Sequence, residues 1–370
     1  MGEKVLMPGV NIKRILVEED ARPYGLTQRI LNRLPNVPVE PVSRQGPVES
    51  LRHLDAGKET LYLSSHRGNL LKPCPGTKEY ICCGYQILNL AANCPLDCSY
   101  CILQFYFLNQ PYLRIFANLE DRLGHFLNVI DNESGQIFRI GTGEFTDSLA
   151  LDHITHWSDL LLPQFSRRKN AVLELKTKTT QINRLLASRY RDRIIVSWSL
   201  NSSQVSAREE REAATIKKRL EAAKRCQDEG FTLGFHFDPL VHHPDWRDGY
   251  VKTIELMDKY IDPRGIIWIS MGSLRFMPGL KPIIRKRHPK STILNGEFIV
   301  GLDGKVRYFK AIRTDLYHFM REQLEKWYPD LGLYLCMESD EVWQTSMGWT
   351  PETSAGLCHY LDRRVLKFFG

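Results

Sequence analysis

The sequence predicts an α/β protein built on a partial (β/α)6 barrel, with an N-terminal α/β extension and a C-terminal β-hairpin/helical region. Three observations support this. Six apolar stretches of strand length alternate with helical patterns between residues 85 and 272, which is typical of parallel β/α units. A short α/β pattern precedes them, and an Asp303-Gly304 turn signal between two alternating stretches follows them. We expect divisions at 1–78, 79–275 and 276–370.

Composition is that of a soluble globular chain that can bury a full core. The chain has 370 residues, of which 43% are hydrophobic and 25% charged. It lacks an apolar run of about 18 residues, the minimum for a membrane span. Its first residues lack the apolar centre of a signal peptide. Nine cysteines in such a chain suggest a reducing compartment. We therefore expect a cytoplasmic protein without a membrane partner.

The N-terminal extension is expected to hold a strand at 14–18 and a helix at 27–34, which Pro35 ends. Prolines at positions 38, 41 and 47 then predict a loop. Cys74, Cys82 and Cys83 precede the first barrel strand. They could ligate a second cluster, but their spacing favours packing or loop thiols.

The six barrel strands are expected at 85–90, 136–141, 171–177, 193–200, 231–238 and 265–272. Between them, helical patterns are clearest at 207–229 and 249–260. A helix at 314–327, a strand at 333–337 and a second helical segment should end the chain. Chemistry in barrels lies at the C-terminal ends of the strands. Polar residues at those ends are therefore candidate site residues.

Three cysteines follow the first barrel strand with the spacing C-x3-C-x2-C: Cys94, Cys98 and Cys101. Three thiolates on one loop can hold three irons of a [4Fe–4S] cubane, and the fourth iron stays open to a substrate. Structural zinc normally takes four ligands in C-x2-C pairs, which this loop lacks. Three unrelated buried thiols are the remaining alternative.

Polar residues end the next barrel strands. Gly141-Thr-Gly143-Glu144 combines glycines that allow close backbone approach with a carboxylate suited to an ammonium group, although a simple turn is as common. Ammonium and hydroxyl groups at Lys176-Thr-Lys178 and at Ser197-Trp-Ser199-Leu-Asn201 could bind a carboxylate and a ribose. His236 and Asp238 end the fifth strand. They are either catalytic groups or polar core residues that are hydrogen-bonded within the protein.

Positive charge is concentrated between residues 276 and 313. Nine Lys or Arg residues there face two acidic ones, an excess that equals the net charge of +7 of the whole chain. Such a cluster suits a polyanion, although a solvated basic face is the alternative. The second hairpin strand carries Arg307, Tyr308 and Lys310, which suit phosphate binding and base stacking. We therefore expect a nucleic acid such as duplex DNA as the partner; that the duplex is damaged is implied only by the family resemblance given next.

With these motifs placed, the chain resembles the spore photoproduct lyase family of radical S-adenosylmethionine (SAM) proteins. The resemblance covers about residues 85–313 and rests on motifs in matching order: Asn93–Gln104, 111–119, Asp147 with Asp152-His-Ile-Thr-His156, Arg219-Leu-Glu-Ala-Ala-Lys, Gly234 with Pro239, Trp246 with Gly249-Tyr250, and the hairpin. It implies a radical SAM barrel with a [4Fe–4S] cluster and SAM. It also implies a reducing electron donor such as flavodoxin or ferredoxin, and cleavage of SAM to a 5'-deoxyadenosyl radical.

The resemblance also assigns site residues. Glu144 would hold the SAM amino group, and Thr146, Lys178 and Ser199 its carboxylate. Arg307 and Tyr308 would meet a lesion flipped out of DNA, a step that costs less for a damaged base. The full cofactor-binding set expected on this basis is Tyr100, Gly141, Gly143, Glu144, Thr146, Lys178, Ser199 and Asn201.

Two positions depart from the family pattern. Glu144 stands where the lyase has a cysteine that returns a hydrogen atom to the repaired thymine, and Ile102 stands where it has a relay tyrosine. Cys336 is our candidate for a substitute donor, and without the relay we expect SAM to be consumed stoichiometrically. The candidate catalytic residues are Glu144, His236, Asp238 and Cys336.

Three functions are compatible with these observations. The first is a carbon–carbon lyase that repairs a UV thymine-dimer-type DNA lesion, and the basic hairpin favours it. The second is a radical SAM enzyme for a non-DNA substrate, which the two departures favour. The third is a nucleic-acid-binding protein with a purely structural cluster, against which the intact SAM-site residues argue.

Overall fold

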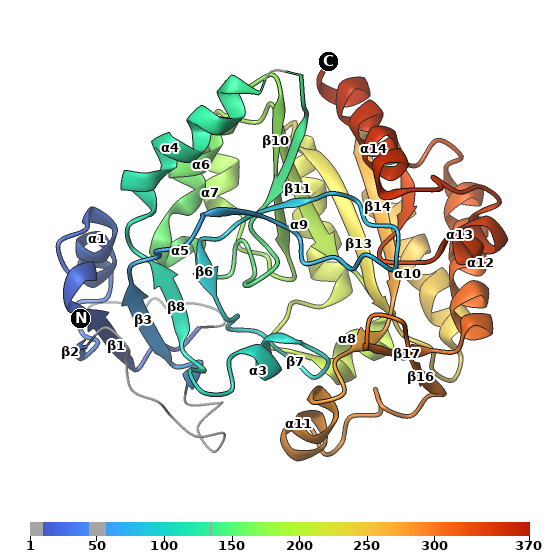
Figure 1. The fold of residues 1–370 in the computed structure, drawn as a ribbon, viewed down its shortest axis with the longest axis horizontal. Helices are drawn as coiled ribbons and strands as arrows, with labels where there is room; N and C mark the ends of the chain where they lie inside the picture. The colour runs from blue at the N-terminus through green and yellow to red at the C-terminus, as the bar shows by residue number, and fades with distance from the viewer. Residues whose placement is uncertain (1–9, 44–56, 134) are drawn as a thin grey trace.

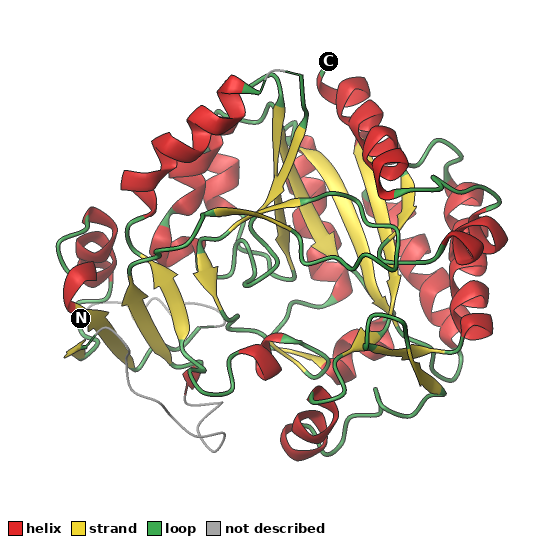
Figure 2. Ribbon diagram, viewed as in Figure 1, coloured by secondary structure: helices red, strands yellow, loops and turns green. Residues whose placement is uncertain are grey.

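The computed structural model describes residues 10–43, 57–133 and 135–370. Its main feature is an eight-stranded sheet that curls into a partial barrel, with helices on its outer side (Figures 1 and 2). A second, five-stranded sheet lies beside it. The strands β13 and β14 point toward the lower side of Figure 1, where the cysteine loop and the hairpin lie.

The six predicted barrel strands are confirmed. They form adjacent parallel strands within the sheet order β18-β14-β13-β11-β10-β9-β5-β4. One edge gains β18 (Leu333–Leu335), parallel to β14, and the other gains β4 (Leu71–Pro73), antiparallel to β5. The six are β5 (Gln86–Leu88), β9 (Phe138–Gly141), β10 (Ala171–Thr177), β11 (Ile194–Ser199), β13 (Thr232–Leu240) and β14 (Ile266–Ser273).

These strands are buried on both faces because helices cover the outside of the sheet. Every residue of β11 and β14 is buried, as expected for central parallel strands. In α9, Ile216, Leu220, Ala223 and Cys226 form the predicted buried stripe. The longer covering helices are α4 (Leu119–Asn132), α6 (Trp157–Phe165), α9 (Ile216–Asp228) and α10 (Trp246–Tyr260).

The helix predicted at 207–229 is wrong in its first third. The chain forms α8 (Ser203–Glu209), then the two-residue strand β12 (Glu210–Arg211), and only then α9. Thr215 caps α9 by accepting a hydrogen bond from the amide of Lys218. Strand β12 pairs with β7 (Asp97–Cys98) of the cysteine loop. This long-range pairing overrides the local helical pattern.

The N-terminal strand and helix are confirmed as β1 (Arg14–Glu18) and α1 (Gly25–Arg33). The loop predicted around Pro41 is wrong, because β2 (Val39–Val42) pairs with β1 at the sheet edge, where a proline is tolerated. Pro47 lies outside the described residues. The sheet also contains β3 (Thr60–Ser64), β8 (Leu113–Phe116) and β6 (Ala91–Ala92), so it includes residues from both sides of position 78.

The C-terminal region contains the predicted hairpin. Strands β16 (Phe298–Val300) and β17 (Val306–Tyr308) pair antiparallel, and β15 (Arg275–Phe276) extends them. Gly304 takes the left-handed conformation that the turn requires, with φ of 74°. Among the described helices, none is long and apolar enough to cross a membrane. The helices of this region are α11 (Leu280–Arg287), α12 (Lys310–Trp327), α13 (Asp340–Met347) and α14 (Ser354–Phe369).

Candidate active site

A cavity of about 350 Å³ lies at the C-terminal ends of the barrel strands. Its size falls in the range of small-molecule sites, about 300–1,000 Å³. The cysteine loop, the strand ends and the hairpin together form its wall. Nine of the residues selected from sequence line it: Tyr100, Cys101, Gly143, Glu144, Lys178, Ser199, His236, Asp238 and Cys336.

The cysteine loop lies between β6 and α3 (Leu103–Tyr106) and is fixed by its own polar groups. The Gln104 amide donates hydrogen bonds to the carbonyls of Cys98 and Ser99, each at 3.0 Å. Asn93 has a left-handed backbone with φ of 72°, and its side chain accepts from the Cys94 amide at 2.9 Å. These hydrogen bonds of Gln104 and Asn93 fix the backbone of the loop.

The short strand β12 holds the middle of this loop. Glu210 lies opposite Cys98 in the β7–β12 pair and accepts a hydrogen bond from the Tyr100 hydroxyl. Arg219 forms an ion pair with Glu210 at 2.5 Å, and both side chains are buried. Burial favours the neutral acid, but Arg219 outweighs it and holds the pKa of Glu210 below its usual value. Sequence reasoning missed Glu210 because it read the segment as a helix.

Asp97 ties the other side of the loop to distant elements. Its carboxylate pairs with Lys58 at 3.1 Å and with Arg287 of α11 at 2.8 Å. Burial opposes ionisation, yet Lys58 and Arg287 together lower the pKa of Asp97 to about 2. A carboxylate with two cationic partners stays ionised throughout the neutral range. Asp97 therefore connects the cysteine loop to the basic helix.

The three cysteines suit a cubane. Burial raises the pKa of Cys98 to about 12 and that of Cys94 above its usual range, and Cys101 adds to each effect because it is close to both. Buried thiols stay protonated unless a cation arrives, so iron would bind with loss of their protons. Among the described residues, no three His, Cys, Asp or Glu side chains surround a position for a single metal ion. A cubane instead places each thiolate on a different iron.

Gly141, which ends β9, and Gly143, which follows it, make room for protein side chains. A β-carbon on Gly141 would lie 1.5 Å from the Tyr85 hydroxyl, and one on Gly143 would lie 2.9 Å from the β-carbon of Lys176. Lys176 forms an ion pair with Glu144 at 2.5 Å. Burial opposes the charge on Lys176, but Glu144 prevails and raises its pKa. The carboxylate assigned to the SAM ammonium therefore already has a cationic partner, which the sequence did not reveal.

Two residues after Glu144, the buried Thr146 hydroxyl has no hydrogen-bond partner among the residues that the structure describes. The adjacent Asp147 accepts from the Thr177 hydroxyl and the Lys178 amide, both at 2.8 Å. The Lys178 ammonium lies 5.8 Å from the centre of the Tyr100 ring. Lys178 lines this end of the cavity and supplies a cation suited to a carboxylate ligand, whereas Thr146 is not among the lining residues.

The floor of the cavity is a buried network that centres on Glu174. This residue, absent from the sequence-based candidates, accepts from His236 Nε2 at 2.8 Å and from Trp268 Nε1 at 2.9 Å. His236 Nδ1 lies 2.6 Å from the Ser270 hydroxyl, so both ring nitrogens have protein partners. Burial opposes ionisation of Glu174, yet His236 keeps its pKa well below the usual value. The contacts of His236 are therefore those of a core histidine whose two ring nitrogens are both hydrogen-bonded within the protein.

Asp238, also on the cavity wall, pairs with Arg275 at 3.0 Å. The same guanidinium donates to the sulfur of Cys336 at 3.3 Å. Asp238, Arg275 and Cys336 thus form one connected group that faces the cavity. Arg275 follows the sixth barrel strand, and the sequence contained no separate signal for it.

Asn201 lies outside the cavity. Its side chain is buried and saturated: it donates to the Pro239 carbonyl at 2.8 Å and accepts from the Tyr250 hydroxyl at 2.8 Å and the Ser202 amide at 3.0 Å. The described contacts of Asn201 are with protein groups, and a role in cofactor binding stays a prediction. Its amide instead connects the ends of β11 and β13.

The hairpin pair also departs from expectation. Arg307 is 1% exposed, forms an ion pair with Asp303 at 2.8 Å and lies 4.0 Å from the centre of the Tyr80 ring. Tyr308 is equally buried and stacks on Phe298. Neither side chain is exposed in this conformation, and their contact with a lesion stays a prediction. Lys310 is exposed but pairs with Glu341 at 2.7 Å.

The basic segment is less charged in three dimensions than its sequence suggests. Asp97, Asp303, Glu338 and Glu341 neutralise five of its nine cations, and three of these acids lie outside the segment. The other four cations lie on or just after α11, exposed and, among the described residues, without an ion-pair partner: Lys281, Arg285, Lys286 and Lys290. We call these four the α11 cations.

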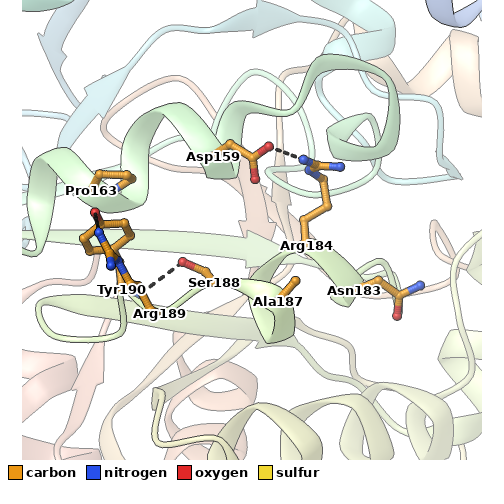
Figure 3. Close-up of a pocket in the computed structure, with 8 residues that line it drawn as sticks. All are labelled: Asp159, Pro163, Asn183, Arg184, Ala187, Ser188, Arg189 and Tyr190. Carbon is orange, nitrogen blue, oxygen red and sulfur yellow. Dashed lines mark hydrogen bonds and ion pairs between the residues drawn. The ribbon is translucent and has the colours of Figure 1, made fainter.

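Figure 3 shows a second hollow, of about 450 Å³, between α6 and α7 (Asn183–Ala187). Arg184 and Asp159 form an ion pair across it. At its other end the Tyr190 amide donates to the Ser188 hydroxyl at 3.1 Å. It contains no thiol and none of the residues selected from sequence, so the barrel cavity is the candidate active site.

Two further cysteines line the barrel cavity. Cys74 and Cys83, which sequence favoured as packing thiols, lie on its wall together with Cys101 and Cys336, whereas Cys82 does not. All of them are free thiols. Their spacing in sequence carried no signal, because the cavity brings together residues about 250 positions apart.

Comparison with known proteins agrees with this architecture. The spore photoproduct lyase of Bacillus subtilis (strain 168) is 24% identical over 332 residues, 85% of this chain and 93% of that protein. The spore photoproduct lyase of Geobacillus sp. is 24% identical over 292 residues, 76% of this chain and 84% of that protein.

Solved structures give the same result for the fold. A spore photoproduct lyase mutant with dinucleoside spore photoproduct matches with a TM-score of 0.79 and 22% identity, covering 88% of this chain and 99% of that one. A second mutant, with bound AdoMet and dinucleoside spore photoproduct, matches with a TM-score of 0.78 and 22% identity over 90% of this chain and 100% of that one. A model of the spore photoproduct lyase family matches residues 14–334. The chain therefore belongs to the spore photoproduct lyase family, a family of radical SAM lyases.

Proposed function

We propose that this protein cleaves SAM reductively and uses the resulting radical to repair a thymine-dimer-type lesion, spore photoproduct, in DNA. One observation carries the proposal. The three-cysteine loop opens through Cys101 into the same cavity that Glu144, Lys178 and Ser199 line. Relatives solved with AdoMet and with dinucleoside spore photoproduct support both ligands.

Cys94, Cys98 and Cys101 would hold the [4Fe–4S] cluster, which supplies the electron that cleaves SAM. The residues of the chain bind and orient. Lys178 and Ser199 line the cavity and suit the SAM carboxylate. Thr146 is proposed as a third contact, since its hydroxyl has no partner among the described residues. Glu144 would accept the SAM ammonium while keeping Lys176 as a second partner. A one-electron donor of the flavodoxin or ferredoxin class would serve the cluster.

The α11 cations would bind the duplex. They are the part of the basic segment that neighbouring acids leave free, and α11 contacts both the cysteine loop, through Arg287, and α3. Exposed apolar side chains lie on the nearby hairpin: Ile299, Val300 and Leu302, the last 82% exposed. Extrusion of a lesion needs cations that bind the phosphates and apolar side chains that contact the unstacked bases, and the two surfaces would supply these.

The cluster assignment is tested with Cys98→Ala, with Cys226→Ala as the matched control because that buried thiol lies on α9 away from the cavity. We expect anaerobically reconstituted Cys98→Ala to lose iron and its broad visible absorbance, and Cys226→Ala to keep both. A full cluster in a Cys94/Cys98/Cys101 triple alanine variant would contradict the assignment.

The DNA surface is tested with a quadruple glutamine variant of the α11 cations, with Lys310→Gln as the control because Glu341 already neutralises that lysine. Each phosphate contact contributes about −0.9 to the slope of log K against log salt. We expect the quadruple variant to bind weakly with a flatter slope, and the control to match the unaltered protein. An unchanged slope in the quadruple variant would remove this surface from the proposal.

A second function has one specific observation in its favour: Glu144 replaces the thiol that the lyase uses, and Ile102 replaces the relay tyrosine. A radical SAM enzyme for a non-DNA substrate would need neither. Anaerobic assay with irradiated DNA distinguishes the two functions. Restored thymine together with 5'-deoxyadenosine supports the lyase, whereas 5'-deoxyadenosine without repair supports the alternative.

A further inference from the structure

Asp238 is a carboxylate of the cavity wall that Arg275 holds in a fixed orientation. It lies near the end of β13, and Arg275 Nη1 and Nη2 donate to its two oxygens at 3.3 and 3.0 Å. The same guanidinium donates to the Ser273 carbonyl at 3.3 Å, which anchors it to β14. A β-carbon on Gly272 would lie 2.8 Å from Asp238 Oδ2 and 2.6 Å from Arg275 Nη1. The pair therefore packs directly against the backbone of β14.

Arg275 leaves part of this carboxylate free for a ligand. A carboxylate has about four acceptor positions on its two oxygens, and Arg275 uses one position on each oxygen. The Asp238 side chain is 29% exposed and lines the cavity. Burial opposes its ionisation, but Arg275 outweighs burial and keeps the pKa of Asp238 below its usual value. Asp238 is thus a fixed, charged acceptor that faces the space where a substrate would lie.

The other carboxylates that line the cavity are less suited to a substrate. Glu174 is only 2% exposed, and it accepts hydrogen bonds within the buried network of the cavity floor. Glu144 pairs with Lys176 and is the acid proposed for the SAM ammonium. Among the carboxylates of this wall, Asp238 is therefore the acceptor that remains for a substrate.

The Asp238–Arg275 pair lies where the hairpin meets the cavity. Arg275 belongs to β15 and lies opposite Arg307 of the hairpin strand β17. Lys305, just before β17, also lines the cavity, and its ammonium lies 3.7 Å from Asp303, beyond hydrogen-bond distance. Burial and the nearby charge of Arg275 lower the pKa of Lys305. A carboxylate acceptor and an ammonium donor therefore line the cavity beside the hairpin.

We propose that Asp238 and Lys305 read the hydrogen-bonding edge of a thymine ring in the lesion: Asp238 accepts from the ring N3–H, and Lys305 donates to a neighbouring carbonyl oxygen. The inference rests on the proposed lesion repair and names the residues that select the base. Enzymes read a flipped base by hydrogen bonds to this edge. Cytosine has no hydrogen on N3 and would place a lone pair against the carboxylate. The two residues therefore favour thymine lesions over cytosine lesions.

Binding is tested without turnover, on the reconstituted full-length protein kept without reductant. Isothermal titration calorimetry compares two probes: the spore photoproduct of thymidylyl-thymidine, and the same dinucleotide methylated at N3 of both rings. Methylation removes the N–H donor and leaves the charged Asp238 acceptor unpaired. We therefore expect the unaltered protein to bind the methylated probe about tenfold or more weakly.

Two variants assign this discrimination to its residues. In Asp238→Asn the amide oxygen should face Arg275, which can only donate, so an amide N–H faces the cavity and cannot accept from N3–H. We expect this variant to bind the two probes about equally. Lys305→Met should bind both probes about fivefold more weakly and keep their ratio. The matched control is Asp315→Asn, which changes an exposed Asp–Arg pair with Arg247 at 2.6 Å and should match the unaltered protein.

The ratio of the two affinities within one variant does not depend on the fraction of folded protein. Equal binding of the probes by the unaltered protein, or an unchanged ratio in Asp238→Asn, would overturn the role of Asp238. The second result together with weaker SAM binding in equilibrium dialysis would assign Asp238 to the cofactor instead. Unchanged affinity of Lys305→Met for the unmethylated probe would overturn the role of Lys305.

Failure of lesion repair itself is distinguishable from these results. If the unaltered protein does not bind spore photoproduct, the proposed function fails. Thymidine 5'-monophosphate and its N3-methyl form then test the two residues alone. Discrimination between these nucleotides that Asp238→Asn removes would support thymine recognition, whereas equal or absent binding of both would overturn it.

Discussion

Replacing Glu210 by Gln should destabilise the fold and the cluster loop together. The carboxylate lies opposite Cys98 and pairs with Arg219 at 2.5 Å, and the two side chains are 1% and 0% exposed. Arg219 also donates to the carbonyls of Ser199 at 2.8 Å and Ala214 at 2.7 Å. Those bonds would persist in the variant, but the guanidinium would be left as a buried charge without its counter-ion.

Breaking a buried ion pair by removing one partner costs about 3–5 kcal/mol. Glutamine keeps the shape and one acceptor oxygen for the Tyr100 hydroxyl, so we expect a loss near the lower limit, about 3 kcal/mol. The free energy of unfolding of a typical domain is only about 5–15 kcal/mol. The variant should therefore fold but lose a substantial part of its stability.

The assay is urea unfolding at pH 7, together with iron content per chain after reconstitution. The matched control is Glu221→Gln on α9, whose partner Lys217 lies 3.8 Å away, with the two side chains 45% and 63% exposed. We expect the control to change stability by less than about 0.5 kcal/mol. Its iron content should match that of the unaltered chain, whereas that of Glu210→Gln should be lower.

The pH dependence gives a second measure. Because the folded-state pKa of Glu210 is lowered, its stabilisation is complete above the unfolded pKa of about 4.3 and is lost as pH falls through the folded value. The difference between the variant and the unaltered protein should shrink in that acidic range. A loss below about 1 kcal/mol at pH 7 would refute the reasoning, since it would mean that water reaches Arg219.

Three further predictions concern the same region. Asp97→Asn should lower the free energy of unfolding by about 2.5 kcal/mol at pH 7, because the pKa of Asp97 in the folded protein, about 2, lies below the ordinary 3.8. Urea unfolding should show this loss above pH 5, and the loss should disappear as the pH falls toward 2. Gly141→Ala should lower stability by about 1–3 kcal/mol, since its β-carbon would overlap the Tyr85 hydroxyl. Gly124→Ala in α4 should instead raise the free energy of unfolding by about 0.5–1 kcal/mol in the same urea experiments, because no described heavy atom outside the helix backbone lies within 4 Å of the added β-carbon. Lys176→Met should leave Glu144 without its cation and weaken or abolish SAM binding in equilibrium dialysis; unchanged affinity would mean that the pair plays no part in shaping the site.

Local patterns in the sequence identified the parallel strands correctly. Buried strands between helices produce continuous apolar runs, and the runs at β9, β10, β11, β13 and β14 were long enough to be distinguished from helix. The Asp303-Gly304 hairpin was equally clear, because only a few residue types take the backbone conformations of a tight turn. Patterns of this kind depend on neighbours a few positions apart.

The errors came from contacts between distant segments. The helix predicted at 207–229 broke because Glu210 pairs with the cysteine loop and with Arg219. Two cations of the basic segment looked free in sequence, but Glu338 pairs with Arg313 and Glu341 pairs with Lys310. A count of charges along the chain cannot show which acids will lie beside them.

The sequence by itself determined the fold class and the cysteine loop, because strand periodicity and a three-thiolate spacing are written in consecutive residues. Only the tertiary structure decided which side chains meet in the cavity. Glu174 lies in the cavity beside His236, to which it is hydrogen-bonded. Arg275 lies there in contact with Asp238 and Cys336. Cys83 and Cys336 line the same cavity although about 250 residues separate them in the chain. Such contacts depend on how the whole sheet closes, and no local pattern encodes that.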